Sequence, residues 1–179
     1  LVSKFLRTKI KFCAEFGKMN MVSEILDTDK ILIDPNDIHT RISIKVYNAL
    51  FYFYHKKYKI AIDCLSELQN EFVFKDYFHE FLNIKITLLY SYLIVGDVEK
   101  GQACIKMLTR RIKMEGREEY NHVIYLLKLV DLDLNKEPSS KNHIKKRDLF
   151  TLFLANNNSE NNFEVASHLI PDLKNRFYI

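Results

Sequence analysis

The sequence has few of the residues that interrupt helices, with 4 glycines and 3 prolines among 179 residues. A turn-rich β-sandwich needs more of both, so this scarcity favours long helices joined by short loops. Tryptophan is absent, and 10 tyrosines and 13 phenylalanines supply the bulky packing groups. No apolar run reaches the roughly 18 residues of a membrane-spanning helix, so we expect no membrane contact.

The sequence also lacks the common signatures of catalytic and cofactor sites. It contains no G-x-G-x-x-G, no P-loop, no H-E-x-x-H and no G-x-S-x-G pattern. Four glycines leave little material for a loop that cradles phosphate groups. We therefore expect a protein without catalytic activity, cofactor or metal.

The three cysteines, Cys13, Cys64 and Cys104, form an odd set without a C-x-x-C pair. Each falls inside a helical pattern, which predicts buried thiols in a reducing compartment and a cytoplasmic location. The chain begins Leu-Val-Ser-Lys, without Met and without a signal-peptide pattern. We expect it to be a part of a longer protein.

Composition predicts one soluble globular domain over residues 1–179, since 47% of residues are apolar and 28% are charged. The net charge of +4 is mild. A dedicated nucleic-acid binder concentrates far more positive charge, so the composition disfavours nucleic acid as the partner.

Apolar residues at three- and four-residue spacing predict a chain of helices and no strand. Asp37 is a helix N-cap type, Gly96-Asp97 is a turn signal, and Gly116 is a helix stop. The stretch 135–142, with Pro138-Ser139-Ser140, is the clearest loop. The predicted helices cover residues 5–16, 19–26, 38–54, 58–71, 75–95, 98–114, 117–134, 143–155 and 162–176.

An internal repeat of about 40 residues relates 44–68 to 84–108, and a repeat of such a length in helical sequence is typical of stacked helical hairpins. Small residues coincide at one position, which lets paired helices approach closely. The matched pairs are Ile44/Ile84, Lys45/Lys85, Tyr52/Tyr92, Ala61/Gly101, Cys64/Cys104 and Leu68/Leu108.

The repeat resembles the tetratricopeptide-repeat family over residues 5–110. The third hairpin carries that family's pattern best, in Tyr92, Gly96-Asp97, Gly101, Ile105 and Leu108. The period is longer than the family's usual 34 residues. The resemblance implies an all-α fold of about four antiparallel helical hairpins, stacked into a right-handed α-α superhelix. It also implies a protein–protein or peptide-binding scaffold or sensor domain of a bacterial-type cytoplasmic protein.

In that family the first helix of each hairpin lines a concave groove, which implies a set of ligand-facing residues here. An apolar groove with basic residues at its rim suits an amphipathic or acidic peptide helix. The alternative is that the last helices of the chain, or a second copy in a homodimer, fill the groove. The expected groove residues are Lys45, Val46, Leu50, Phe53, Tyr54, Lys85, Ile86, Tyr90, Leu93 and Ile94.

The pattern acid-x-x-His occurs twice, as Asp76/His79 and as Glu119/His122, and helical-bundle di-iron sites use this spacing. We interpret both pairs as exposed residues near helix starts, where acids favour the helix dipole.

Basic residues cluster in three places, and the simplest interpretation is a solvated face. Binding of nucleic acid or another polyanion is the alternative function, and it predicts salt-sensitive binding. The clusters are Lys4/Arg7/Lys9/Lys11, Arg110/Arg111/Lys113 and Lys141/Lys145/Lys146/Arg147.

Overall fold

The computed structural model describes residues 18, 20–21, 24–25, 37–72, 74, 77–116, 118–134 and 140–156. Contacts divide the chain into two compact units, Leu1–Gly96 and Asp97–Ile179, called unit 1 and unit 2 here. Each unit is described on its own. The helices expected over 5–16 and 162–176 lie outside the described residues. The expectation of one domain stays a prediction.

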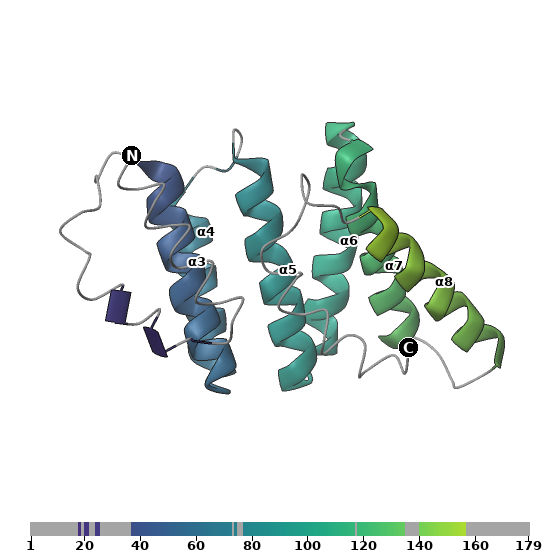
Figure 1. The fold of residues 1–179 in the computed structure, drawn as a ribbon, viewed down its shortest axis with the longest axis horizontal. Coiled ribbons are helices and arrows are strands. Elements are labelled where there is room, and N and C mark those ends of the chain that lie inside the picture. The colour runs from purple at the N-terminus through teal and green to yellow at the C-terminus, as the bar shows by residue number, and fades with distance from the viewer. Residues whose placement is uncertain are drawn as a thin grey trace. The chain divides into compact units, whose positions relative to one another are not determined.

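In the part of unit 1 from residue 37 onward, helices α3 (Ile38–Tyr54), α4 (Tyr58–Glu71) and α5 (Phe78–Val95) run alongside one another (Figure 1). Helix α3 turns through a short connection into α4, and α5 packs on both. Helix α4 is amphipathic and buries Ala61, Leu65 and Leu68. Burial of such an apolar face supplies most of the stability of a helix this short.

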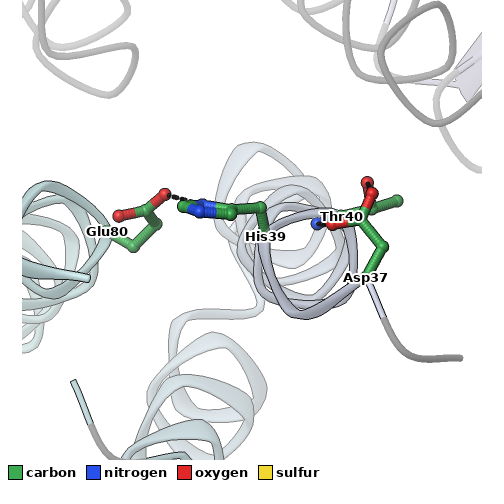
Figure 2. Close-up of polar contacts among 4 residues, drawn as sticks. All are labelled: Asp37, His39, Thr40 and Glu80. Atoms are coloured by element: carbon green, nitrogen blue, oxygen red, sulfur yellow. Dashed lines mark hydrogen bonds and ion pairs between the residues drawn. The ribbon is translucent and has the colours of Figure 1, made fainter. Parts of the chain in front are cut away.

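Polar contacts at the helix starts tie α3 to α5 (Figure 2). The Asp37 carboxylate accepts from the Thr40 amide at 3.1 Å and from the Thr40 hydroxyl at 2.6 Å, so Asp37 caps α3 as the sequence predicts. His39, which precedes Thr40 in α3, has its Nδ1 atom 2.6 Å from Oε1 of Glu80 in the first turn of α5. The His39 ring also meets the edge of Tyr77, with 4.6 Å between ring centres.

Helix α5 is buried nearly all round between Phe78 and Ser91, where only His79, Glu80 and Lys85 are partly exposed. Its two most buried polar side chains are accommodated within the helix. The Thr87 hydroxyl donates to the Asn83 carbonyl and the Ser91 hydroxyl to the Thr87 carbonyl, each at 2.8 Å. A hydroxyl bonded to the preceding turn carries little desolvation cost into a core.

Unit 2 contains α6 (Val98–Glu115), a 3₁₀ turn η2 (Glu118–Tyr120), α7 (Asn121–Leu134) and α8 (Ser140–Asn156). Helix α7 packs against both α6 and α8 (Figure 1).

Helix α8 closes on α7 with three buried apolar side chains, Leu149, Phe150 and Phe153. An ion pair of Lys146 with Asp133, 2.7 Å long, joins the same two helices.

Glycines end α5 and α6 as the sequence predicts. Gly96 has a φ of 80° and Gly116 a φ of 62°, and both stand at C-caps in the left-handed region that favours glycine. Asp97 follows as the N-cap of α6, and its carboxylate accepts from the Lys100 amide at 3.1 Å. The Gly96-Asp97 turn is therefore confirmed by its geometry.

The all-α prediction is confirmed, and the described residues contain no strand. The helices predicted over 38–54 and 58–71 have the observed bounds. Helix α5 begins at Phe78, three residues later than predicted. The helix predicted over 117–134 is a 3₁₀ turn, η2, followed by the α-helix α7 from Asn121.

The predicted loop 135–142 was wrong at its end, since α8 begins at Ser140. Serine is as typical of helix starts as of loops, and proline is tolerated just before or within a first turn, so the Pro-Ser-Ser signal has both meanings.

The hairpins α3–α4 and α7–α8 are observed as packed pairs. The hairpin predicted from 75–95 and 98–114 spans the two units, so this hairpin and the superhelix stay predictions. Within the part of the chain that the structure describes, no helix combines the length and apolarity needed to cross a membrane.

Core burial in α4 predicts unequal costs for two aliphatic truncations. Leu65 is fully buried, whereas the Ile60 residue is 43% exposed. Leu65→Ala should lower the free energy of unfolding by about 2–5 kcal/mol. Ile60→Ala should lower it by less than about 1 kcal/mol. Urea unfolding followed by circular dichroism measures both, and equal losses would contradict the assigned packing face.

The cap of α6 predicts a pH dependence. Hydrogen bonds from the Lys100 side chain and amide hold the pKa of Asp97 below its usual value. The charged carboxylate therefore stabilises the fold above the unfolded pKa of about 3.9, and this contribution is lost as the pH falls through the folded pKa. The stability gap between wild type and Asp97→Asn should shrink between pH 5 and pH 3 in urea unfolding. A constant gap would show that the charge of Asp97 does not matter.

Candidate functional site

The apolar residues expected to line a groove in unit 1 lie in its core. Val46, Leu50, Phe53, Ile86 and Tyr90 are all buried, with exposed fractions of 7% or less. The Phe53 and Tyr90 rings lie 5.8 Å apart, centre to centre, and join α3 to α5. A partner could not reach these side chains in the structure as it stands.

The remaining expected groove residues differ in exposure. Leu93 is half-buried, and Ile94 is 37% exposed near the end of α5. The side chain of Tyr54 lies outside the described residues.

The two lysines expected at the groove rim already have partners within unit 1. Lys45 pairs with the Glu71 carboxylate, which also accepts from Arg41 at 2.9 Å. Arg41 in turn lies over the Phe72 ring at 5.0 Å. Lys85 is half-buried and donates to the Gln69 side-chain oxygen. These cations connect α3 and α5 to α4, so less of their charge is available to an external ligand.

The acid-x-x-His pairs do not form a metal centre among the described residues, where no group of three or more His, Cys, Asp or Glu could hold an ion. Asp76 lies outside the described residues. Glu119 is exposed, as expected, but the expectation that His122 is exposed was wrong, since it is 1% exposed. Because α7 begins at Asn121, His122 falls on its packed side and stacks on Phe153 of α8 at 6.3 Å.

A groove between α6 and α7 in unit 2 is a concave surface on which charged side chains converge. We call it the α6–α7 groove, and its cavity volume is about 550 Å³. Buried Ile105 and Leu127 form an apolar floor. The described lining residues are Ile105, Lys106, Thr109, Arg110 and Lys113 of α6, and Leu127, Lys128 and Asp131 of α7.

Positive charge dominates this groove. Lys106, Arg110, Lys113 and Lys128 are exposed and face one lining carboxylate, Asp131. None of the four cations makes an ion pair with a carboxylate in the described part of the chain. The described lining therefore carries four positive charges and one negative charge.

The structure divides the basic cluster Arg110/Arg111/Lys113. Arg110 and Lys113 line the α6–α7 groove, whereas Arg111 lies 3.9 Å from Glu115 on another side of α6. Lys106 and Lys128 were not identified from the sequence as residues of this groove. The spacing of Lys106, Arg110 and Lys113, at i, i+4 and i+7, could have revealed a basic stripe on one helix face. The contribution of α7 has no such signal, because it depends on tertiary packing.

A second hollow of about 630 Å³ lies along another face of α6. Ala103, Met107 and Met114 give it an apolar character, and Met114 is 73% exposed. All of its described lining residues come from α6, and Lys106 and Arg110 border both hollows. Arg110 and Lys106 therefore form the ridge between the two concave faces.

The described cysteines occupy packing positions in α4 and α6. Cys104 is buried and Cys64 is half-buried, and neither forms a disulfide. Burial raises the pKa of the Cys64 thiol, and the nearby Glu67 and Asp63 carboxylates add to this effect. A raised pKa makes the thiolate scarce and the sulfur unreactive. Cys13 lies outside the described residues.

Packed helical hairpins and a concave surface place the chain among the all-α helical repeat proteins. The family model described as tetratricopeptide repeat matches residues 43–177. The chain belongs to the tetratricopeptide-repeat family. The match extends the resemblance seen over 5–110 to the C-terminal part of the chain. Searches of curated proteins and of solved structures found no match.

The burial of Phe53 predicts that it serves stability. Phe53→Ala should lower the free energy of unfolding by about 3–5 kcal/mol, because it leaves a cavity between α3 and α5. Leu93→Ala, at a half-buried position, should cost less, about 1 kcal/mol. Thermal and urea unfolding of both variants measure the difference. A Phe53→Ala protein as stable as wild type would mean that the ring lines an open surface.

Proposed function

We propose that this chain is a non-catalytic scaffold that binds a protein partner, and that the α6–α7 groove is the binding surface. The family to which the chain belongs is one of protein-interaction scaffolds. The observation that carries the choice of surface is the combination of an apolar floor with four cations that pair with no described carboxylate. Polar groups placed around an apolar depression supply specificity and affinity together.

The groove that the sequence implied in unit 1 is a weaker choice of surface. Its apolar residues are buried, and its basic residues contact Glu71 and Gln69. A binding role there would require the packed helices of the core to separate first, which would reduce the apparent affinity. The groove in unit 2 needs no such opening.

We propose that the protein works in the cytoplasm, under reducing conditions. Cys64 and Cys104 stand at equivalent repeat positions and act as small packing residues in α4 and α6. Thiols in such positions serve the fold in their reduced form.

A peptide-display selection on the full chain tests the proposed surface. Thr109 is half-buried in the groove, so Thr109→Trp should fill it and weaken the selected peptides by about tenfold or more, or about 1.4 kcal/mol. Thr151→Trp is the matched control, since Thr151 is exposed on α8 and does not line the groove. Circular dichroism and melting curves establish that both variants fold.

Two results would reject the proposed surface. One is a selection that yields no binding peptide, and the other is equal binding to wild type and to Thr109→Trp. Sedimentation velocity at micromolar concentration tests the alternative occupant, a second copy of the chain. If the wild-type chain forms a dimer and Thr109→Trp dissociates it, the groove binds a second copy of the chain and not a partner protein.

A further inference from the structure

Resting on the proposed function, we infer that the partner segment is an acidic amphipathic helix whose carboxylates pair with Lys106, Arg110 and Lys113. These three cations stand at i, i+4 and i+7 on α6. At 1.5 Å per residue they span about 10 Å, in steps of about 6 Å and about 4.5 Å. A partner helix with acids at the same spacing presents its carboxylates in register with them.

Charge complementarity identifies acidic groups as the ligand chemistry. The groove's cations have no carboxylate partner in the described structure, whereas Arg41 and Lys45 of unit 1 share Glu71. Unpaired cations that converge on one depression repel one another, and a bound carboxylate relieves this repulsion. Lys128 adds a fourth charge from the facing helix α7.

The apolar component of the groove requires an amphipathic partner. Ile105 and Leu127 form the floor, and the aliphatic stems of Lys106 and Lys113 border it. A segment that carried charge alone would leave this apolar surface unmatched. An apolar side chain between the acids would meet the floor while the carboxylates reach the rim.

Nucleic acid fits the surface less well than a peptide. The basic stripe covers about 10 Å of α6, whereas a nucleic-acid strand carries phosphates in a continuous row. Exposed carboxylates follow at the Gly116 end of the helix, in Glu115, Glu118 and Glu119. They would repel phosphates that extend past Lys113. The described lining also contains no aromatic ring on which a base could stack.

Three synthetic helical peptides and one oligonucleotide provide the test by fluorescence anisotropy on the full chain. The first peptide carries Glu at i, i+4 and i+7 beside Leu, the second has Gln at those three positions, and the third rearranges the first so that its acids encircle the helix. The fourth probe is single-stranded DNA of 20 nucleotides. We expect the first peptide to bind about tenfold more tightly than the other three probes, and salt to weaken it.

Matched charge-removal variants locate the site. Lys113→Gln with Lys128→Gln removes two cations that line the α6–α7 groove and not the second hollow, and should weaken the first peptide by about tenfold. Lys141→Gln with Lys145→Gln removes the same charge from exposed positions of α8 and should leave binding within about twofold. Equal losses in the two variants would show that net charge alone attracts the peptide, which would overturn the inference.

Other outcomes are equally decisive. Equal binding of the Gln peptide would remove the acidic requirement, equal binding of the rearranged peptide would remove the register, and tighter binding of DNA would assign the groove to nucleic acid. Display peptides that bind in the groove but lack acids would leave the proposed function standing and reject only the acidic partner. No groove-dependent binding of any peptide would reject both.

Discussion

The burial of α5 on nearly all sides between Phe78 and Ser91 is the constraint on which the arrangement of unit 1 depends. A helix with apolar residues on most of its surface cannot leave them in water, so neighbours must cover it. Helices α3 and α4 supply two of these contacts, through Phe53 against Tyr90 and through the buried stripe Ala61, Leu65 and Leu68. The same constraint removes α5 as a binding surface, because Ile86 and Tyr90, which would face a ligand in an open groove, serve the core.

Helix α6 differs from α5 because fewer of its residues are buried. Its buried residues are Gly101, Cys104, Ile105, Leu108 and Ile112, and its basic residues Lys106, Arg110 and Lys113 are exposed. Its basic residues differ in their contacts from those of unit 1. Lys45 and Lys85 bind Glu71 and Gln69 and hold helices together, whereas Lys106, Arg110 and Lys113 pair with no carboxylate of the described chain. Cations that hold helices together belong to the fold, and the cations that converge on the α6–α7 groove are the basis of the proposed recognition surface.

Much of the fold could be predicted from local signals. Asp37, Gly96-Asp97 and Gly116 marked helix ends because capping and left-handed turns involve only neighbouring residues. The repeat positions Ala61/Gly101 and Leu68/Leu108 are buried in both copies, as packing positions should be. The candidate site was less accessible to prediction. Burial of Phe53 depends on how α5 packs. The presence of Lys128 and Lys106 in one groove depends on how α7 packs, and neither arrangement has a signature in local sequence.

Hydrogen exchange with and without a bound acidic helical peptide measures where on the chain recognition occurs. If recognition occurs on α6 and α7, slower exchange will be confined to segments 105–113 and 127–131, which contain the groove residues, and exchange in α3 and α5 of unit 1 will not change. Protection that appears instead in 46–53 and 86–93, with none in α6, would contradict it and would return the binding site to the groove that the sequence implied.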